Sequence, residues 1–202
     1  MSMLTVLPCL DSSELATARH LELDIPRDRA TTLGHSAVAA GDLGHYAIAR
    51  LAKVEWSNDV QVARAGKVSI PPTAPLPAHT PTSFAETSVQ VTNETTLLAA
   101  KRVVDAGTRP LALNFANGIN PGGGFLSGSR AQEEVLCRSS ALYHCLVNDP
   151  MYEAHRRRPQ PDSTNWAIYS PRVPVFRHDD GTELDRPCIL DVITCPDSHR
   201  AR

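Results

Sequence analysis

The feature that most constrains this chain of 202 residues is a glycine-rich segment between an apolar stretch and two acidic residues. Residues 111–116 (LALNFA) are short and nearly all apolar, which predicts a buried central strand. Three consecutive glycines follow at 122–124. A backbone without Cβ atoms can adopt positive φ angles and lets a ligand approach closely. The order predicts a strand, a ligand-binding bend and then a helix.

The helix after the bend is expected to begin at Gln132, so that Glu133 and Glu134 stand in its first turn. Free amides and the positive dipole end make a helix N-terminus favourable for anions. In open α/β sheets, ligands bind at the carboxyl ends of strands. We therefore expect a crevice for a phosphorylated or sugar-bearing small molecule. The segment is neither a P-loop, since no Gly-Lys-Ser/Thr follows, nor a GxGxxG fingerprint, since Ser127 occupies its third position.

The remaining pattern predicts an α/β layered domain with a largely parallel sheet. Hydrophobic periodicity, caps and breakers predict helices at 14–23, in part of 27–54, at 94–105 with Asn93 as its cap, and at 132–147. They predict strands at 87–92, 111–116, 167–169, 173–176 and 189–194. Gly34, Gly41 and Gly44 are expected to interrupt the alanine-rich stretch, and the proline-rich residues 69–82 to form an extended loop.

Composition excludes several classes of protein. The 20 basic and 22 acidic side chains give a net charge of −2, unlike a protein that coats duplex nucleic acid. The apolar runs are far shorter than the ~20 residues that span a bilayer, and the N-terminus is a poor signal peptide, so no membrane partner is expected. Five cysteines form no disulfide framework, which favours a reducing, cytoplasmic setting.

The glycine-rich segment and its flanks resemble those of a known family. The stretches NFAN and NPGGG, followed after seven residues by Gln132-Glu133-Glu134, are similar to the signature of microbial-type poly(ADP-ribose) glycohydrolases, enzymes of the macrodomain superfamily. Residues 138–143, 168–177 and 191–196 also look like stretches of this family. The resemblance covers roughly residues 27–196.

The resemblance implies a macrodomain-like three-layer α/β/α sandwich with an N-terminal helical extension. We expect the extension and a proline-rich connector at residues 1–82 and the catalytic core at 83–202. The chain ends at Arg202, before further strands and helices that family members carry. We therefore expect the fold to be incomplete at its C-terminus, and activity of residues 1–202 alone to be weak or absent.

The resemblance also implies roles for the site residues. Glu134 would be the catalytic acid, Glu133 would hold ribose hydroxyls, and Gln132 would orient the site. Further residues expected to bind substrate are Asn117, Asn120, Gly122, Gly123, Gly124 and Phe125. Cleavage of a ribose–ribose O-glycosidic bond needs a group that protonates the leaving oxygen and then activates water, which a carboxyl can do. Glu133 and the diphosphate are both negative, so we expect them to keep Glu134 protonated when substrate is bound.

Two other functions stay open. The chain could be an ADP-ribose-binding module or inactive remnant without turnover, although two adjacent acids favour an enzyme. It could also remove mono-ADP-ribose from a protein or nucleobase. Cys188, Cys195 and His199 match no common zinc spacing, so no metal and no cofactor are expected. The expected partner is ADP-ribose or poly(ADP-ribose) on modified proteins, and the chain is expected to be a monomer.

Overall fold

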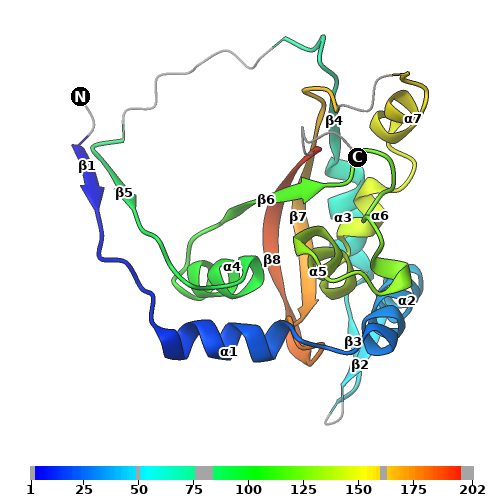
Figure 1. Cartoon of the computed structure of the whole chain (residues 1–202). Helices are drawn as coiled ribbons and strands as arrows, with labels where there is room; N and C mark the ends of the chain where they lie inside the picture. The colour runs from blue at the N-terminus through cyan, green and yellow to red at the C-terminus, as the bar shows by residue number, and fades with distance from the viewer. Residues whose placement is uncertain (1–2, 49–50, 76–83, 160–162, 197–202) are drawn as a thin grey trace.

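The computed structural model describes residues 3–48, 51–75, 84–159 and 163–196, and it has a mixed α/β fold (Figure 1). Its helices are α1 (Ser13–Leu23), α2 (Arg27–Leu43), α3 (Ser57–Gly66), α4 (Thr96–Asp105), α5 (Gln132–Ser139), α6 (Leu142–Leu146) and α7 (Pro150–Arg156), with a 3-10 turn, η1 (Phe125–Ser127). Its strands are β1 (Met3–Val6), β2 (His45–Ile48), β3 (Leu51–Glu55), β4 (Val68–Ile70), β5 (Glu86–Val89), β6 (Leu111–Ala116), β7 (Ala167–Arg177) and β8 (Glu183–Pro196). Within these residues, no helix is long and apolar enough to cross a bilayer.

The central sheet has the strand order β4-β7-β8-β6. Only β6 and β8 pair in parallel, whereas β4–β7 and β7–β8 are antiparallel. The prediction of a largely parallel sheet is therefore wrong. The reason is local: β7 and β8 form a hairpin, because the His178 amide donates to the Thr182 carbonyl at 2.9 Å and Gly181 adopts a φ of +91°.

Several predicted elements have different bounds. The stretches 167–169 and 173–176 belong to one strand, β7, which continues through a register shift between Ser170 and Val173. The predicted helix 132–147 breaks at Ser140, whose extended backbone bridges to Val175. The Ser140 hydroxyl bonds to the Leu136 carbonyl and the Leu142 amide, so it replaces the helix ladder at the break.

The start of α4 is also corrected. Its cap is Thr95, whose hydroxyl accepts from the Leu98 amide at 3.1 Å. Asn93 instead donates from its side chain to Asp11 and from its amide to the Leu10 carbonyl. The cap of α1 is Ser12, whose hydroxyl accepts from the Leu15 amide at 3.2 Å.

The main core lies on one face of the sheet. Alternate residues of β6 and β8, such as Ala112 and Val192, are buried with Leu97 of α4 and with Leu136 of α5. The opposite face of β6 carries Leu111, Leu113 and Phe115, which are exposed among the described residues.

Some residues of the expected N-terminal extension and connector pack against the central sheet. Ser69 and Ile70 were expected in a loop, but they lie in β4, which pairs with β7 of the central sheet. Ala63 of α3 is fully buried in the main core. Parts of residues 1–82 therefore pack with the central sheet. The division between 1–82 and 83–202 stays a prediction, and residues 76–83 of the proline-rich stretch lie outside the described residues.

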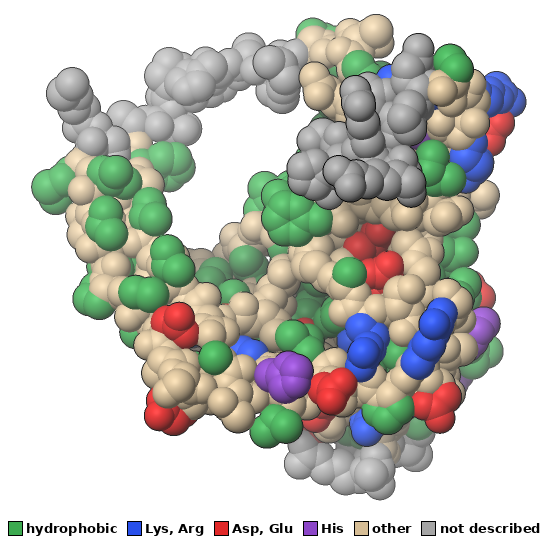
Figure 2. Space-filling model, in the orientation of Figure 1, with side chains coloured by type: hydrophobic (Ala, Val, Ile, Leu, Met, Phe, Trp, Pro, Cys, Tyr) green, Lys and Arg blue, Asp and Glu red, His purple; other side chains and the backbone are tan. Residues whose placement is uncertain are grey.

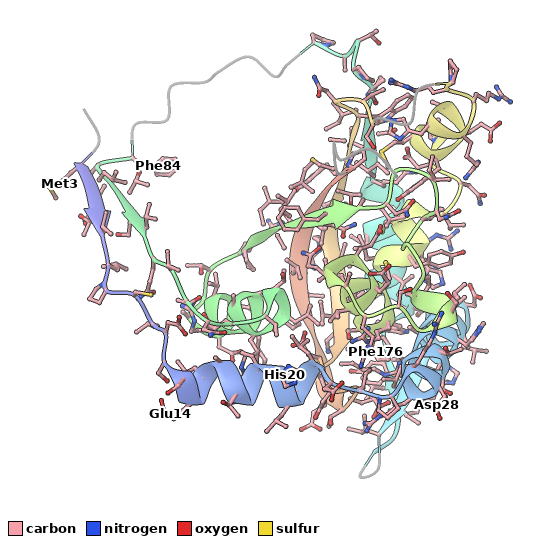
Figure 3. All side chains as sticks on the ribbon, in the orientation of Figure 1. Met3, Glu14, His20, Asp28, Phe84 and Phe176 are labelled. Carbon is pink, nitrogen blue, oxygen red and sulfur yellow. The ribbon has the colours of Figure 1, made fainter. Side chains whose placement is uncertain are left out.

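A separate two-stranded ribbon, β1 and β5, projects from this body (Figure 1). Its strands pair in parallel from Met3 with Glu86 to Val6 with Val89. Apolar side chains gather on it (Figure 2), and Met3 and the neighbouring Phe84 lie at its far end (Figure 3).

Two glycines that were expected to interrupt α2 are inside it, and only Gly44 ends it, in a left-handed conformation. A Cβ on Gly41 would lie 2.2 Å from the His144 ring. A Cβ on Gly34 would lie 2.7 Å from the carbonyl oxygen of Phe125 in η1. These glycines let α2 approach its neighbours closely, which offsets their low helix propensity.

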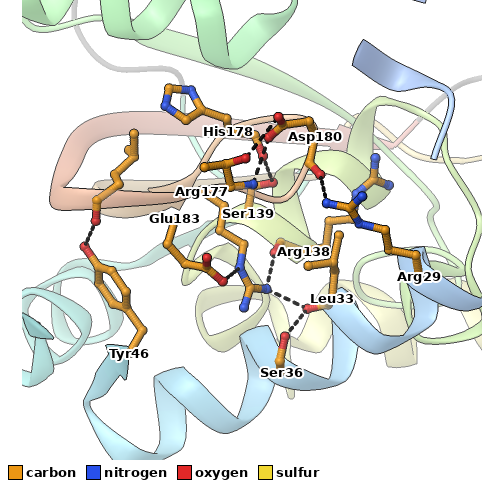
Figure 4. Close-up of polar contacts among 12 residues, drawn as sticks. Arg29, Leu33, Ser36, Tyr46, Arg138, Ser139, Arg177, His178, Asp180 and Glu183 are labelled. Atoms are coloured by element: carbon orange, nitrogen blue, oxygen red, sulfur yellow. Dashed lines mark hydrogen bonds and ion pairs between the residues drawn. The ribbon is translucent and has the colours of Figure 1, made fainter. Parts of the chain in front are cut away.

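A buried arginine joins α2, α5 and the β7–β8 hairpin (Figure 4). Arg177 donates to the Leu33 carbonyl at 2.9 Å, to the Arg138 carbonyl at 3.3 Å, and to Glu183 at 3.2 Å. Nearby, Arg29 donates to the Asp180 carbonyl at 2.9 Å and Ser139 donates to the His178 carbonyl at 3.4 Å. These bonds fix the C-terminal end of α5, and hence the direction in which its first turn points.

The close approach at Gly34 makes a prediction about stability. An alanine in a helix interior normally gains about 1 kcal/mol over glycine. Gly34→Ala should instead lower the free energy of unfolding by ~1–3 kcal/mol, because its Cβ would meet backbone of η1 that cannot rotate away. Denaturant unfolding measures this. His35→Ala, at the exposed neighbouring position, is the control and should be neutral or stabilising. A stabilised Gly34→Ala protein would contradict the contact.

Candidate active site

The site forms where the glycine bend meets the first turn of α5. Gly122 and Gly123 adopt φ angles of +72° and +57°. A Cβ on Gly123 would lie 2.3 Å from Oε1 of Glu134 and 3.1 Å from Oε2 of Glu133. The absence of a side chain at Gly123 is therefore what lets both carboxyls reach the bend.

Glu134 is held by the bend itself. The Gly124 amide donates to its Oε1 at 3.0 Å. The side chain is mostly buried, with 8% of the residue exposed. This bond leaves Oε2 available, so the carboxyl can exchange a proton with a molecule bound beside the glycines.

Glu133 lies deeper, with 2% of the residue exposed. Its Oε2 accepts from the Asn117 amide at 2.7 Å and its Oε1 accepts from the Asn114 side chain at 3.4 Å. Burial raises the pKa of Glu133 to about 7, the adjacent Glu134 adds to the rise, and the bonds from Asn117 and Asn114 oppose it. Glu133 can therefore be neutral or charged near neutral pH.

The Gln132 side chain bonds to the backbone of β6 and not to the glycine bend. Its Oε1 accepts from the Phe115 amide at 3.0 Å and its Nε2 donates to the Leu113 carbonyl at 2.7 Å. The side chain thus satisfies one backbone N–H and one backbone C=O on the edge of β6 that pairs with no other strand of the described sheet. This supports the expected orienting role, because it ties the start of α5 to the strand that leads into the bend.

Asn117 and Asn120 lie in the turn that connects β6 to the glycines. The Asn117 Oδ1 accepts from the amides of Ile119 and Asn120 at 2.8 and 2.9 Å. The Asn120 carbonyl accepts from the Gly123 amide at 2.9 Å. Both asparagines are exposed, so the Asn117 Nδ2 and the Asn120 side chain can face a ligand.

The Phe125 side chain is buried beneath the bend, and its role in binding substrate stays a prediction. It was expected among the substrate-binding residues, but it is 1% exposed and its ring packs against Tyr143 with centroids 5.0 Å apart. A Cβ on Gly34 would lie 2.7 Å from the Phe125 carbonyl oxygen, and a Cβ on Gly122 would lie 2.9 Å from the Phe125 ring, so both glycines are close to Phe125. Its ring therefore supports the bend from beneath and does not line a surface that a ligand can reach.

Three buried polar residues lie behind the site, and none of them was predicted as a site residue. Asn114 is fully buried and bonds to Glu133 and to Thr194, so the one polar residue within the apolar run 111–116 was its signal. Arg138 is 1% exposed and lies one helical turn after Glu134. Asp179 is 1% exposed and accepts from the Thr95 hydroxyl at 2.7 Å, and burial raises its pKa.

A hollow of about 270 Å³ lies beside Gln132. It is bordered by the end of α1, the start of α4 and the start of α5, with Arg130 and Asp179 among its lining residues. No sequence motif pointed to it, because its walls come from segments far apart in the chain.

The cysteine pair that was considered for zinc does not form a metal site with other described residues. Burial raises the pKa of the Cys188 and Cys195 thiols, which favours protonated thiols over thiolate ligands. No group of three or more His, Cys, Asp or Glu residues within the described ranges could hold a metal ion. His199 lies outside those ranges.

Comparison with known proteins gives consistent matches. The family model for the catalytic domain of microbial-type PARG matches residues 35–178. The crystal structure of poly(ADP-ribose) glycohydrolase from Thermomonospora curvata has a TM-score of 0.77 and 37% identity, over 84% of this chain and 64% of that chain. The structure bound to the inhibitor ADP-HPD has a TM-score of 0.76 and 35% identity, over 85% of this chain and 63% of that chain.

This chain therefore spans less than two thirds of the length of those Thermomonospora proteins. No curated protein matches it. The predicted mixed α/β, macrodomain-like class is confirmed by these structural matches.

The burial of Glu133 predicts a dependence of stability on pH. A carboxyl whose pKa rises from 4.5 unfolded to about 7 folded stabilises the fold most below pH 4.5 and loses that stabilisation as the pH rises through 7. Glu133→Gln cannot ionise. It should therefore be nearly as stable as the parent at about pH 4 and more stable by up to ~3 kcal/mol at about pH 8.

Unfolding followed by circular dichroism at both pH values tests this. The matched control is Glu55→Gln, because Glu55 is exposed and its hydrogen bond with Lys53 lowers its pKa, so its loss should not stabilise the protein at the higher pH. The same stability difference between Glu133→Gln and the parent at both pH values would show that Glu133 is charged throughout.

Proposed function

The chain belongs to the microbial-type PARG catalytic-domain family, and we propose that it hydrolyses the ribose–ribose O-glycosidic bonds of poly(ADP-ribose) and releases ADP-ribose. The observation that carries this proposal is the contact between Gly123 and the two carboxyls. A reaction at a sugar needs a carboxyl beside a surface that a ribose can approach closely, and the bend supplies both.

Glu134 is the acid and then the base in this proposal. It protonates the oxygen that leaves C1 of the ribose, and positive charge develops on the ribose ring as that bond breaks. The Glu134 carboxylate then takes a proton from a water that attacks C1, which restores the acid. The Gly124 amide holds one oxygen of Glu134, so the other oxygen keeps a defined direction through both steps.

Glu133 holds the ribose hydroxyls. Its oxygens accept hydrogen bonds from the Asn117 amide and the Asn114 side chain, and a carboxylate has about four lone-pair sites in all. Because its pKa is about 7, it can accept a hydrogen bond from a hydroxyl or donate one to it at neutral pH. Its negative form also lies where it stabilises the positive charge on the ribose ring.

The remainder of the ligand follows the glycines. The bend exposes backbone close to the first turn of α5, whose cap residue Ala131 provides no side-chain cap, and a diphosphate is the kind of anion that free amides at such a turn attract. The hollow beside Gln132 is bordered by Arg130, which pairs with Asp24 at 2.9 Å, and by the acidic residues Glu94 and Asp179. A relative in complex with the inhibitor ADP-HPD supports a ligand of this type.

We also propose a cytoplasmic location, which the free thiols support: all five cysteines are unpaired. The monomeric state stays a prediction.

Substitution of the acid tests the proposed reaction. Glu134→Gln keeps the size of the side chain but cannot supply the proton. It should lower the rate of ADP-ribose release from poly(ADP-ribose) by at least ~100-fold. Its affinity for free ADP-ribose, measured by calorimetry, should stay within about threefold of the parent.

Glu55→Gln is the matched control for rate, since that carboxyl is exposed and lies at the end of β3. An unchanged rate in Glu134→Gln would overturn the assignment. A parent chain that binds ADP-ribose but releases none from polymer would identify a binding module, and release only from mono-modified protein would identify a mono-ADP-ribosyl hydrolase.

A further inference from the structure

Two side chains at the C-terminal end of α7 form hydrogen bonds with the turn that contains Asn117 and Asn120. His155 is 4% exposed, and its Nδ1 lies 3.0 Å from the carbonyl oxygen of Gly118. The neighbouring Arg156 donates to the carbonyl oxygen of Ile119 at 2.8 Å. Two successive carbonyls of the turn are thus bound by two successive side chains of one helix.

The contacts define the hydrogen positions on the His155 ring. A carbonyl only accepts, so Nδ1 carries the hydrogen that bonds to Gly118. The Thr164 amide only donates, and it lies 3.4 Å from Nε2, with the Thr164 hydroxyl at 2.7 Å. Nε2 is therefore the acceptor, and the His155 ring links the segment at 163–164 to the turn.

The helix that presents His155 is itself fixed to the sheet. Its cap, Asp149, accepts from the Met151 amide at 3.0 Å and from the Ser69 hydroxyl of β4 at 2.9 Å. The other carboxylate oxygen pairs with Lys67 at 2.9 Å. The Asp149 side chain is fully buried, so α7 is a rigid support and the position of His155 is determined by β4.

The turn has no room to move toward α7. A Cβ on Gly118 would lie 2.9 Å from the Ser163 hydroxyl and 3.1 Å from Nδ1 of His155. On the other side, the Asn117 amide donates to Glu133 at 2.7 Å. A chain of direct contacts therefore runs from His155 through Gly118 and Asn117 to a carboxyl of the site.

We propose that His155 is a positioning residue: its Nδ1–H bond to Gly118 sets the turn that aims Asn117 and Asn120 at the ribose and delivers the Asn117 amide to Glu133. The proposal rests on the proposed function for the identity of the ligand. His155 does not touch the substrate. It acts through the backbone of the turn, so its loss should weaken ligand binding more than it changes the chemical step.

Two amide substitutions separate the two bonds of the ring. In His155→Asn, the side-chain nitrogen is attached to Cγ, as Nδ1 is in histidine, so it can keep the bond to Gly118 and lose the bond to Thr164. In His155→Gln, the amide group lies one atom further out, near the place of Nε2, so it can keep the bond to Thr164 and lose the bond to Gly118. Both variants bury a polar amide at one site, so a general loss of stability is common to them.

The affinity for ADP-ribose should separate the variants. By calorimetry, His155→Gln should bind ADP-ribose about tenfold more weakly than the parent, as expected for one lost buried hydrogen bond. His155→Asn should stay within about threefold. With poly(ADP-ribose) as substrate, His155→Gln should raise KM with little change in kcat. Equal affinities in the two variants would overturn the proposal.

A measurement without ligand keeps this test apart from the proposed function. Amide hydrogen exchange of Asn117, Ile119 and Asn120 should be faster in His155→Gln than in His155→Asn, by about tenfold. The Tyr152 amide within α7 is the internal control and should be equal in both. If the parent binds no ADP-ribose, the proposed function fails, and the exchange rates alone still decide the role of His155; equal rates in the turn would overturn it.

Discussion

The structure depends on one close contact, between the backbone of Gly123 and the carboxyls of Glu133 and Glu134. No side chain other than hydrogen fits there, since a Cβ would lie 2.3 Å from Glu134. The contact requires that the end of β6 lie next to the first turn of α5. Gln132 provides that alignment, because its side chain bonds the backbone of β6 at Leu113 and Phe115.

Two carboxyls buried beside each other are costly, and the fold offsets that cost by holding both ends of α5. At its start, backbone amides of Asn117 and Gly124 each donate to one carboxyl. Near its end, Arg177 bonds the Arg138 carbonyl and joins α5 to α2. These bonds do not fully compensate for the burial of Glu133, and its pKa is therefore still raised. The same burial that destabilises the charged form leaves a carboxyl that can be protonated near neutral pH.

Features encoded by neighbours in the chain could be predicted, and features set by distant partners could not. The predicted strand 111–116, the bend and the start of α5 at Gln132 are confirmed. They could be predicted because apolar runs, glycines and acids in a first helical turn are signals carried by neighbouring residues. Whether Glu133 and Glu134 act as assigned stays a prediction. The helix break at Ser140 depends on a bridge to Val175, and the burial of Phe125 depends on α2. Neither partner is near in sequence. The antiparallel β7–β8 pairing is set locally, by the turn at 178–182, but hydrophobic periodicity does not show the direction in which a strand runs.

The most direct measurement compares two glycine substitutions in their effect on ADP-ribose binding. Gly123→Ala and Gly107→Ala both place an alanine at positive φ, +57° and +81°, so both carry similar backbone strain. Only at Gly123 would the new Cβ meet the site, since nothing lies within 4 Å of it at Gly107. Calorimetry should find that Gly107→Ala binds ADP-ribose as the parent does and that Gly123→Ala does not bind. Equal binding by the two variants would contradict the account.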